Sequence, residues 1–181
     1  MDASDGERAN AEDLEGLREA FPTEWREPPL GWEALTAWEA EAGVVLPEPY
    51  RSFIAEIANG SSLGPPEDGG LLPLGWLPEQ WPHGTGPRNP SASFPLTEAW
   101  IWEEDDDAAG EHISAVYNDG SVVLGTEESG MYWLLTTTGD SPGSVWLVAD
   151  VGAQPYPGPI ASSFPDWVRR WQNGNGWWDG N

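Results

Sequence analysis

The densest group of side chains with chemical potential is an acidic run in the second half of the chain. It comprises Glu103, Glu104, Asp105, Asp106 and Asp107, and Glu111 follows shortly after. Grouped carboxylates can hold a divalent cation, but an EF-hand needs alternating ligands, a central glycine and a glutamate at the twelfth position, and the run lacks that pattern. Consecutive like charges usually form a solvated loop. A solvated loop and a docking patch for a basic partner therefore both stay open, ahead of a metal site.

Catalytic groups of other kinds are scarce. The chain has no cysteine, which excludes disulfides, thiolate nucleophiles and cysteine-ligated metal sites. Its two histidines do not have the His-x-x-x-His spacing of a metal site. We expect His83 in a proline- and glycine-rich loop and His112 at the start of a strand. The sequence therefore predicts no enzyme, no cofactor and no metal site.

The charge balance restricts the partners. Seven basic residues, all of them arginine, face 31 acidic ones, which gives a formal net charge of −24. A surface this negative repels nucleic acid and anionic lipid, and it speeds encounter with basic proteins. The acidic, polar start, residues 1–16, is not a secretory signal, and no apolar run is long enough to span a membrane. We therefore expect a cytoplasmic protein.

Helical spacing of apolar residues predicts four helices. The first covers residues 12–21 and the second 31–43, where Gly43 suits the left-handed position after a helix. The third begins within 46–54 with its two prolines in the first turn, continues through an apolar stripe to Ile57, and is closed by Asn59-Gly60. The last follows Ser163, which has capping-box spacing to Asp166.

The remaining apolar segments predict strands. We expect short strands at 71–74 and 97–102, and an antiparallel meander from 112 to 148. Its first hairpin joins residues 113–117 to 122–124 through Asn118-Asp119-Gly120, and its later strands cover 131–136 and 145–148. Residues 78–95 are expected to be a surface loop and 152–161 to be irregular.

Helices, then strands, then one helix indicate a single α+β domain. We expect an antiparallel sheet of about five or six strands flanked by α-helices. The expected organisation is an acidic N-terminal extension with a short helix at 1–29, the main domain at 30–173, and a glycine- and tryptophan-rich tail at 174–181.

Thirteen tryptophans are unusually many. Those on helix stripes or in strands are expected in the core: Trp32, Trp38, Trp133, Trp146, Trp167 and Trp171. Trp is also enriched at binding hot spots. For the tryptophans near loops and the acidic run, a partner-binding role and a place at the edge of the core stay open: Trp76, Trp81, Trp100 and Trp102.

Four motifs occur in order along the chain. They are Leu46-Pro47-x-x-Tyr50-x-x-Phe53 closing on Asn59-Gly60, a strand Gly130-Met131-Tyr132-Trp133-Leu134-Leu135, a strand Gly143-Ser144-Val145-Trp146, and Ser163-Phe164-x-x-Trp167. Their ordered combination over roughly residues 30–172 resembles the SUKH superfamily, in the branch that includes the fungal cell-wall-synthesis regulators.

The resemblance implies binding without catalysis. Many bacterial members look like immunity proteins that neutralise toxins, often nucleases, and such toxins are often basic because they must hold phosphate. The expected partner is therefore a basic toxin domain. The expected contact surface is the acidic run, Glu103 to Asp107, with Glu111, and with Trp100 and Trp102 as apolar anchors. The alternative is a regulatory scaffold linked to cell-wall synthesis or glycan recognition.

Overall fold

The computed structural model describes residues 11–65, 70–78, 81, 88–101, 109–128, 130–139, 142–149, 152–156 and 163–172. This part of the chain forms five helices and five strands. The helices are α1 (Ala11–Ala20), α2 (Trp32–Ala42), α3 (Tyr50–Glu56), α4 (Ala109–Asn118) and α5 (Phe164–Gln172). The strands are β1 (Trp100–Ile101), β2 (Ser121–Glu128), β3 (Met131–Thr136), β4 (Val145–Ala149) and β5 (Gly152–Pro155).

The strands form one antiparallel sheet in the order β1-β5-β4-β3-β2. The expected single α+β domain with an antiparallel sheet of about five strands is confirmed. β3 lies between β2 and β4, and its side chains from Tyr132 to Thr136 are all buried. β1 and β2 are the two edges of the sheet.

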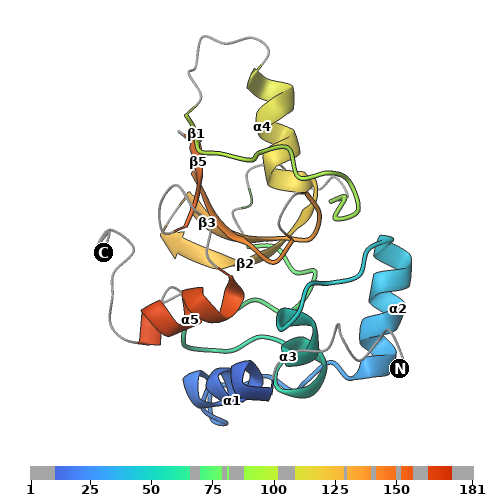
Figure 1. The fold of residues 1–181 in the computed structure, drawn as a ribbon, viewed down its shortest axis with the longest axis vertical. Coiled ribbons are helices and arrows are strands. Elements are labelled where there is room, and N and C mark those ends of the chain that lie inside the picture. Colours follow the sequence, from blue (N-terminus) through green and yellow to red (C-terminus); the bar gives the residue numbers. More distant parts are fainter. Residues whose placement is uncertain are drawn as a thin grey trace.

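Helices cover both faces of the sheet. Figure 1 shows α4 on one side, with α1, α3 and α5 on the other. Successive strand side chains point to opposite faces, so neighbouring residues of β3 enter two separate cores. Trp133 packs with Phe53 and Phe164 of the helices, whereas Leu134 packs with Val116 of α4.

Aromatic rings join the helices of the larger core. The Phe53 ring of α3 lies 5.1 Å from the Phe21 ring and 5.6 Å from the Phe164 ring of α5, between ring centroids. Leu17 of α1 and Phe21 are buried in the same cluster. α1 therefore contributes to the main core, although it lies in the region expected to be an extension.

The helix predictions hold for α1, α2 and α5. In α5, Ser163 and Asp166 contact each other as the capping-box spacing predicts, with the Asp166 N–H 3.4 Å from the Ser163 hydroxyl oxygen. The third helix differs, since α3 begins only at Tyr50. Pro47 and Pro49 precede the helix, and the Arg51 and Phe53 N–H groups donate to their carbonyls.

The prediction of a hairpin around Asn118-Asp119-Gly120 is wrong. Residues 113–117 belong to α4, and Val116 and Tyr117 form its buried stripe with partly buried Ile113. These β-prone residues also have the i, i+3, i+4 spacing of a helix, so the short segment alone could not separate the two structures. His112 consequently lies inside a helix instead of starting a strand.

The loop and strand predictions also need correction. Residues 71–74 form no strand, although the Leu72 N–H donates to Leu124 O at the β2 edge. The described part of 78–95 is not a simple surface loop, because Trp81 and Phe94 are buried in the smaller core. The segment expected to be irregular includes β5, whose strand depends on pairing with β4 and β1. Within the described residues 97–101 of the expected strand 97–102, only the two residues of β1 are strand.

A candidate partner-binding surface at the sheet edge

An apolar hollow of about 310 Å³ lies at the β1 edge of the sheet. Its lining comes from β1, β5, β4 and the start of β3, and it includes Trp100, Ile101, Met131, Leu147, Ala149 and Gly152. The Ile101 side chain is 79% exposed, the highest value among the exposed large hydrophobic residues of the described chain. An exposed aliphatic residue beside an apolar hollow is typical of a contact surface.

Of the residues expected to contact a partner, the structure places Trp100 at this hollow. Trp100 is partly buried and packs against the smaller core, so it lines the hollow and also closes the core. Trp102 and the acidic residues 103–107 lie outside the described residues. Glu111 is in α4, but its side chain is not described. In the sequence, the acidic run follows Ile101 after one residue, Trp102, and precedes α4.

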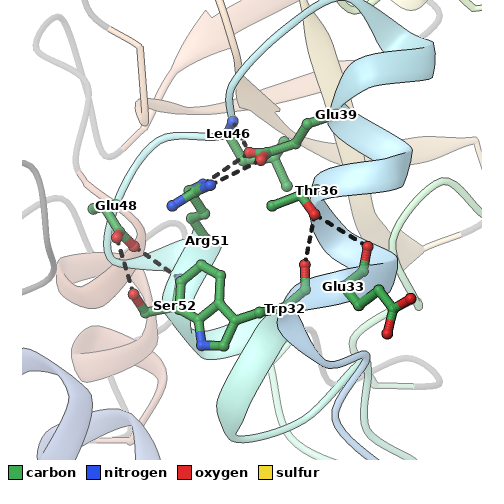
Figure 2. Close-up of polar contacts among 8 residues, drawn as sticks. All are labelled: Trp32, Glu33, Thr36, Glu39, Leu46, Glu48, Arg51 and Ser52. Atoms are coloured by element: carbon green, nitrogen blue, oxygen red, sulfur yellow. Dashed lines mark hydrogen bonds and ion pairs between the residues drawn. The ribbon is translucent and has the colours of Figure 1, made fainter. Parts of the chain in front are cut away.

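A second group of polar side chains joins α2 to α3 (Figure 2). Glu39 of α2 is buried, and its Oε2 accepts hydrogen bonds from the Leu46 N–H at 2.8 Å and from Arg51 Nε at 2.9 Å. Arg51 Nη2 donates to Glu39 Oε1 at 3.0 Å, which makes the ion pair bidentate. The guanidinium also lies 5.0 Å from the centroid of the Trp32 ring.

This group is structural. Both carboxylate oxygens of Glu39 are occupied, and Glu48 similarly accepts from the N–H and hydroxyl of Ser52. Polar side chains whose oxygens are paired in this way fix the geometry of the junction between α2 and α3. The cluster anchors Leu46, the first residue of the Leu-Pro-x-x-Tyr motif, against α2.

The other motif residues also hold the fold. Asn59 Oδ1 accepts the Leu74 N–H at 2.8 Å, and Gly60 lies close to the Leu71 carbonyl. Gly130 has a φ of 86° in the turn before β3. The large apolar residues of the motifs are buried: Leu46, Tyr50, Phe53, Trp133, Val145, Trp146, Phe164 and Trp167. The motifs therefore report the fold and not a reactive site.

The tryptophans divide differently from the expectation. Trp133, Trp146 and Trp167 are in the core as expected, but Trp32 is 39% exposed, because it covers Arg51 instead of the core. Of the residues left open, Trp81 is buried, whereas Trp76 is 64% exposed. Trp76 is thus the most exposed tryptophan that the structure describes.

Arg88 was not distinguished by sequence reasoning from the other scattered arginines. Its Nη2 donates to Tyr117 O and to Ser121 Oγ, both at 2.8 Å, and its Nη1 donates to Ser121 O. The guanidinium lies 5.7 Å from the Trp81 ring centroid. Burial lowers the pKa of the Arg88 guanidinium to about 10, and the nearby Asp119 carboxylate opposes this shift. Arg88 therefore stays charged at neutral pH and ties the segment at 88–90 to the junction between α4 and β2.

Replacing this clamp should destabilise the fold. In Arg88→Met the donors to two backbone carbonyls and one hydroxyl are lost. A single hydrogen bond to a charged group contributes about 1.5–3 kcal/mol, and the contributions of bonds made by one side chain do not simply add. We expect the free energy of unfolding, measured by urea titration, to fall by about 2–4 kcal/mol. Arg18→Met is the control, because Arg18 is exposed and its contact to Glu15 is 3.5 Å long. Equal losses in both variants would contradict the clamp.

One serine motif matches a catalytic spacing. Residues 139–143 read Gly-Asp-Ser-Pro-Gly, which fits the Gly-x-Ser-x-Gly pattern of a nucleophile elbow. An elbow joins a strand to a helix, whereas this segment connects the antiparallel strands β3 and β4. Asp140 and Ser141 themselves lie outside the described residues. The spacing therefore occurs in a connection between strands and does not indicate a hydrolase.

The described residues also lack two other features. They contain no group of three or more His, Asp or Glu side chains placed to hold a metal ion. Among them there is also no helix with the length and apolar character needed to cross a membrane.

The comparison with known families decides the relationship. The SMI1 / KNR4 family (SUKH-1) matches residues 29–170, more than three quarters of the chain. The chain belongs to the SUKH-1 family. The resemblance stated from the four motifs is thereby confirmed. No curated protein and no solved structure matches the chain. Membership supports a SUKH-type module of a family whose members generally bind other proteins without catalysis.

Proposed function

We propose that this SUKH-1 protein is a cytoplasmic, non-catalytic immunity protein that neutralises a cognate toxin by one-to-one binding. The contact surface is the hollow at the β1 edge together with the acidic run that follows it. The observation that carries the proposal is Ile101, which is 79% exposed beside that hollow and is separated in sequence by one residue, Trp102, from five consecutive carboxylates.

The two halves of this surface suit different parts of a partner. The hollow accepts an apolar side chain, and buried apolar anchors at the centre of an interface supply most of the binding energy. The carboxylates attract a basic surface and speed association, an effect that falls as the salt concentration rises. A nuclease is a suitable partner, since its substrate-binding surface must be basic to hold phosphate.

The test is co-expression with the C-terminal domain of the protein encoded next to this one. We expect that domain to kill cells when expressed alone, and survival to be restored when both are present. A stable one-to-one complex, measured by light scattering after gel filtration, is expected in the rescued cells. Rescue without a complex would contradict neutralisation by binding.

Two variants separate the apolar and acidic contributions. Ile101→Asp should weaken the complex at least tenfold, mainly through faster dissociation. Its matched control is Leu63→Asp, because Leu63 is also an exposed aliphatic residue, at 53%, but does not line the hollow.

Reversing the charges of residues 103–107 should slow association and remove much of its salt dependence. An unchanged affinity and salt dependence after charge reversal would show that the acidic run is not the contact surface.

The second candidate is a regulatory scaffold linked to cell-wall synthesis or glycan recognition. Exposed tryptophans favour it, since Trp32 and Trp76 both present aromatic surface to solvent. The same co-expression distinguishes the two. A neighbouring domain that is harmless and forms no complex would replace the immunity proposal with the scaffold.

A further inference from the structure

The hollow at the β1 edge lies on the same face of the sheet as α5. Leu147 lines the hollow and is paired with Trp133 of β3 and Gln154 of β5, and residues paired in this way project to one face. Trp133 packs on Trp167 of α5, with 5.5 Å between ring centroids. Ile101 is on this face too, because its partner in β5 is two residues from Gln154. The hollow therefore continues the surface on which α5 packs.

The second half of α5 is tied to the chain next to the hollow. Arg170 Nε donates to the Tyr156 hydroxyl at 2.8 Å, and the guanidinium lies 5.5 Å from the centroid of the Tyr156 ring. Tyr156 follows β5 and is two residues after Gln154, which lines the hollow. Two extended residues span about 7 Å. The last turn of α5 therefore lies close to the hollow.

The sequence after α5 supplies apolar side chains within reach of the hollow. α5 ends at Gln172, and the chain continues Asn173-Gly174-Asn175-Gly176-Trp177-Trp178. Five extended residues, the separation between Gln172 and Trp177, span about 17 Å, which is more than twice the length of chain between Tyr156 and Gln154. Both tryptophans can therefore reach the hollow.

Charge favours this segment over a second copy of the chain as the occupant. Residues 173–178 carry no charge, whereas the whole chain has a formal net charge of −24, so that two copies repel each other. A tryptophan side chain buries a large apolar area, and the lining of the hollow, with Met131 and Leu147, is mostly apolar. A short tether also raises the local concentration of the segment to about the millimolar range, so even a weak contact is populated.

We propose that Trp177 and Trp178 fill the hollow at the β1 edge when no partner is bound. Their indole rings pack against Met131 and Leu147, beside Ile101. Docking within the chain needs no partner, whereas its consequence for a partner rests on the proposed function. A partner that uses the hollow must displace the two rings, and its apparent affinity is lowered in proportion to the fraction of chains in which the hollow is open.

The test places one reporter on the segment, which is possible because the chain has no cysteine. Asn181→Cys carries a nitroxide, and NMR records the methyl signals of carbon-13-labelled isoleucine and methionine. We expect the nitroxide to weaken the Ile101 and Met131 signals at least about twofold more than the Ile113 signal, because the tethered segment keeps the label near the hollow. Ile113 packs in the smaller core, against the opposite face of the sheet.

Two variants identify the side chains that dock. Trp177→Ser combined with Trp178→Ser should restore the Ile101 signal to the level of Ile113. Trp76→Ser is the matched control and should change neither signal, because Trp76 is also an exposed tryptophan, at 64%, but does not line the hollow. Unchanged positions of the remaining methyl signals show that the fold is kept in each variant.

Three results would overturn the proposal. The first is equal weakening of the Ile101, Met131 and Ile113 signals. The second is weakening that persists after both tryptophans are replaced. The third comes from mixing nitroxide-labelled chains that lack carbon-13 with methyl-labelled chains that lack the nitroxide. Loss of the Ile101 signal in this mixture would assign the contact to a second copy of the chain.

A partner identified by co-expression gives a second readout. If the segment fills the hollow at least half of the time, the variant without Trp177 and Trp178 should bind that partner at least about twofold more tightly. An unchanged affinity would show that the partner and the segment do not compete. The NMR result involves no partner, so a failure of the immunity proposal and a failure of the docking can be told apart.

Discussion

A chain shortened to begin at Pro29, where the SUKH-1 match begins, should lose cooperative unfolding. The match leaves out α1, yet Leu17, Ala20 and Phe21 are at most 3% exposed and belong to the main core. Removing a buried Leu and a buried Phe costs about 2–5 and 3–5 kcal/mol respectively. Their sum is comparable with the whole stability of a typical domain, about 5–15 kcal/mol.

The point variant Phe21→Ala tests the same packing between the α1 region and the main core while keeping α1 in the chain. Its ring lies 5.1 Å from the Phe53 ring, and the side chain is fully buried. We expect the free energy of unfolding to fall by about 3–5 kcal/mol, measured by urea titration with circular dichroism. Val45→Ala is the matched control, because Val45 is 66% exposed and should cost less than about 0.5 kcal/mol. A shortened chain as stable as the full one would show that α1 contributes nothing to the stability of the domain.

α1 is also tied to the rest of the chain by polar contacts that the family boundaries leave out. Arg26 Nε donates to Phe21 O at 2.6 Å, and Arg26 Nη2 donates to Arg18 O at 2.9 Å, so the end of α1 is capped by a side chain from the following segment. Arg169 of α5 contacts Asp13 of α1 at 3.5 Å across the surface. The core contacts account for most of the expected loss, since exposed ion pairs contribute little.

The elements that were predicted correctly are those whose apolar and capping residues all lie within the element itself. α5 has a cap and a full apolar stripe, and its hydroxyl–carboxylate cap and buried Trp167 follow the pattern. β3 is almost wholly apolar, as a strand buried on both faces must be. In these cases the information lies within about ten residues.

The failures occurred where distant residues decide the structure. Ile113, Val116 and Tyr117 have the residue types of a strand but the i, i+3, i+4 spacing of a helix, and helix formation is decided by their burial against β3 and the segment at 94. β5 contains glycine and proline and has little strand propensity. It is a strand because β4 and β1 pair with it on both sides.

The contact surfaces were only partly predictable for the same reason. The acidic run and the neighbouring tryptophans stand out by composition, so the β1 edge could be anticipated. Ile101 could not, because its 79% exposure follows from the sheet order, which leaves β1 at an edge. The structural role of Arg88 could not be predicted from the sequence either, since its acceptors at Tyr117 and Ser121 are about thirty residues away.

The two edges of the sheet differ within the described residues. At β2, the Leu72 N–H donates to Leu124 O and Arg88 donates to Ser121 O, so loop residues occupy this edge. At β1 the described strand is only two residues long. Short edge strands limit unwanted pairing between sheets, which favours recognition by side chains at this edge instead of by strand addition.

Arg51→Met should be among the most damaging single substitutions in the chain. It leaves the Glu39 carboxylate, 6% exposed, with the Leu46 N–H but without its cation. Removing one partner of a buried ion pair costs about 3–5 kcal/mol, because the remaining charge stays buried without compensation. The Trp32 ring would also lose the guanidinium that it covers. Urea titration should show this loss with an unchanged m-value, since the fold itself is kept.

A double-mutant cycle identifies the cause. Replacing both members, Glu39→Leu with Arg51→Met, removes the uncompensated charge, so the double variant should be more stable than Arg51→Met alone. Arg169→Met is the exposed counterpart, because Arg169 and Asp166 are both more than half exposed, and it should cost less than about 1 kcal/mol. If the double variant were the least stable of the series, the pair would contribute through the Leu46 contact and the packing of Arg51 on Trp32, and not through the charge that it neutralises. The comparison therefore separates an electrostatic role of the α2–α3 junction from a geometric one.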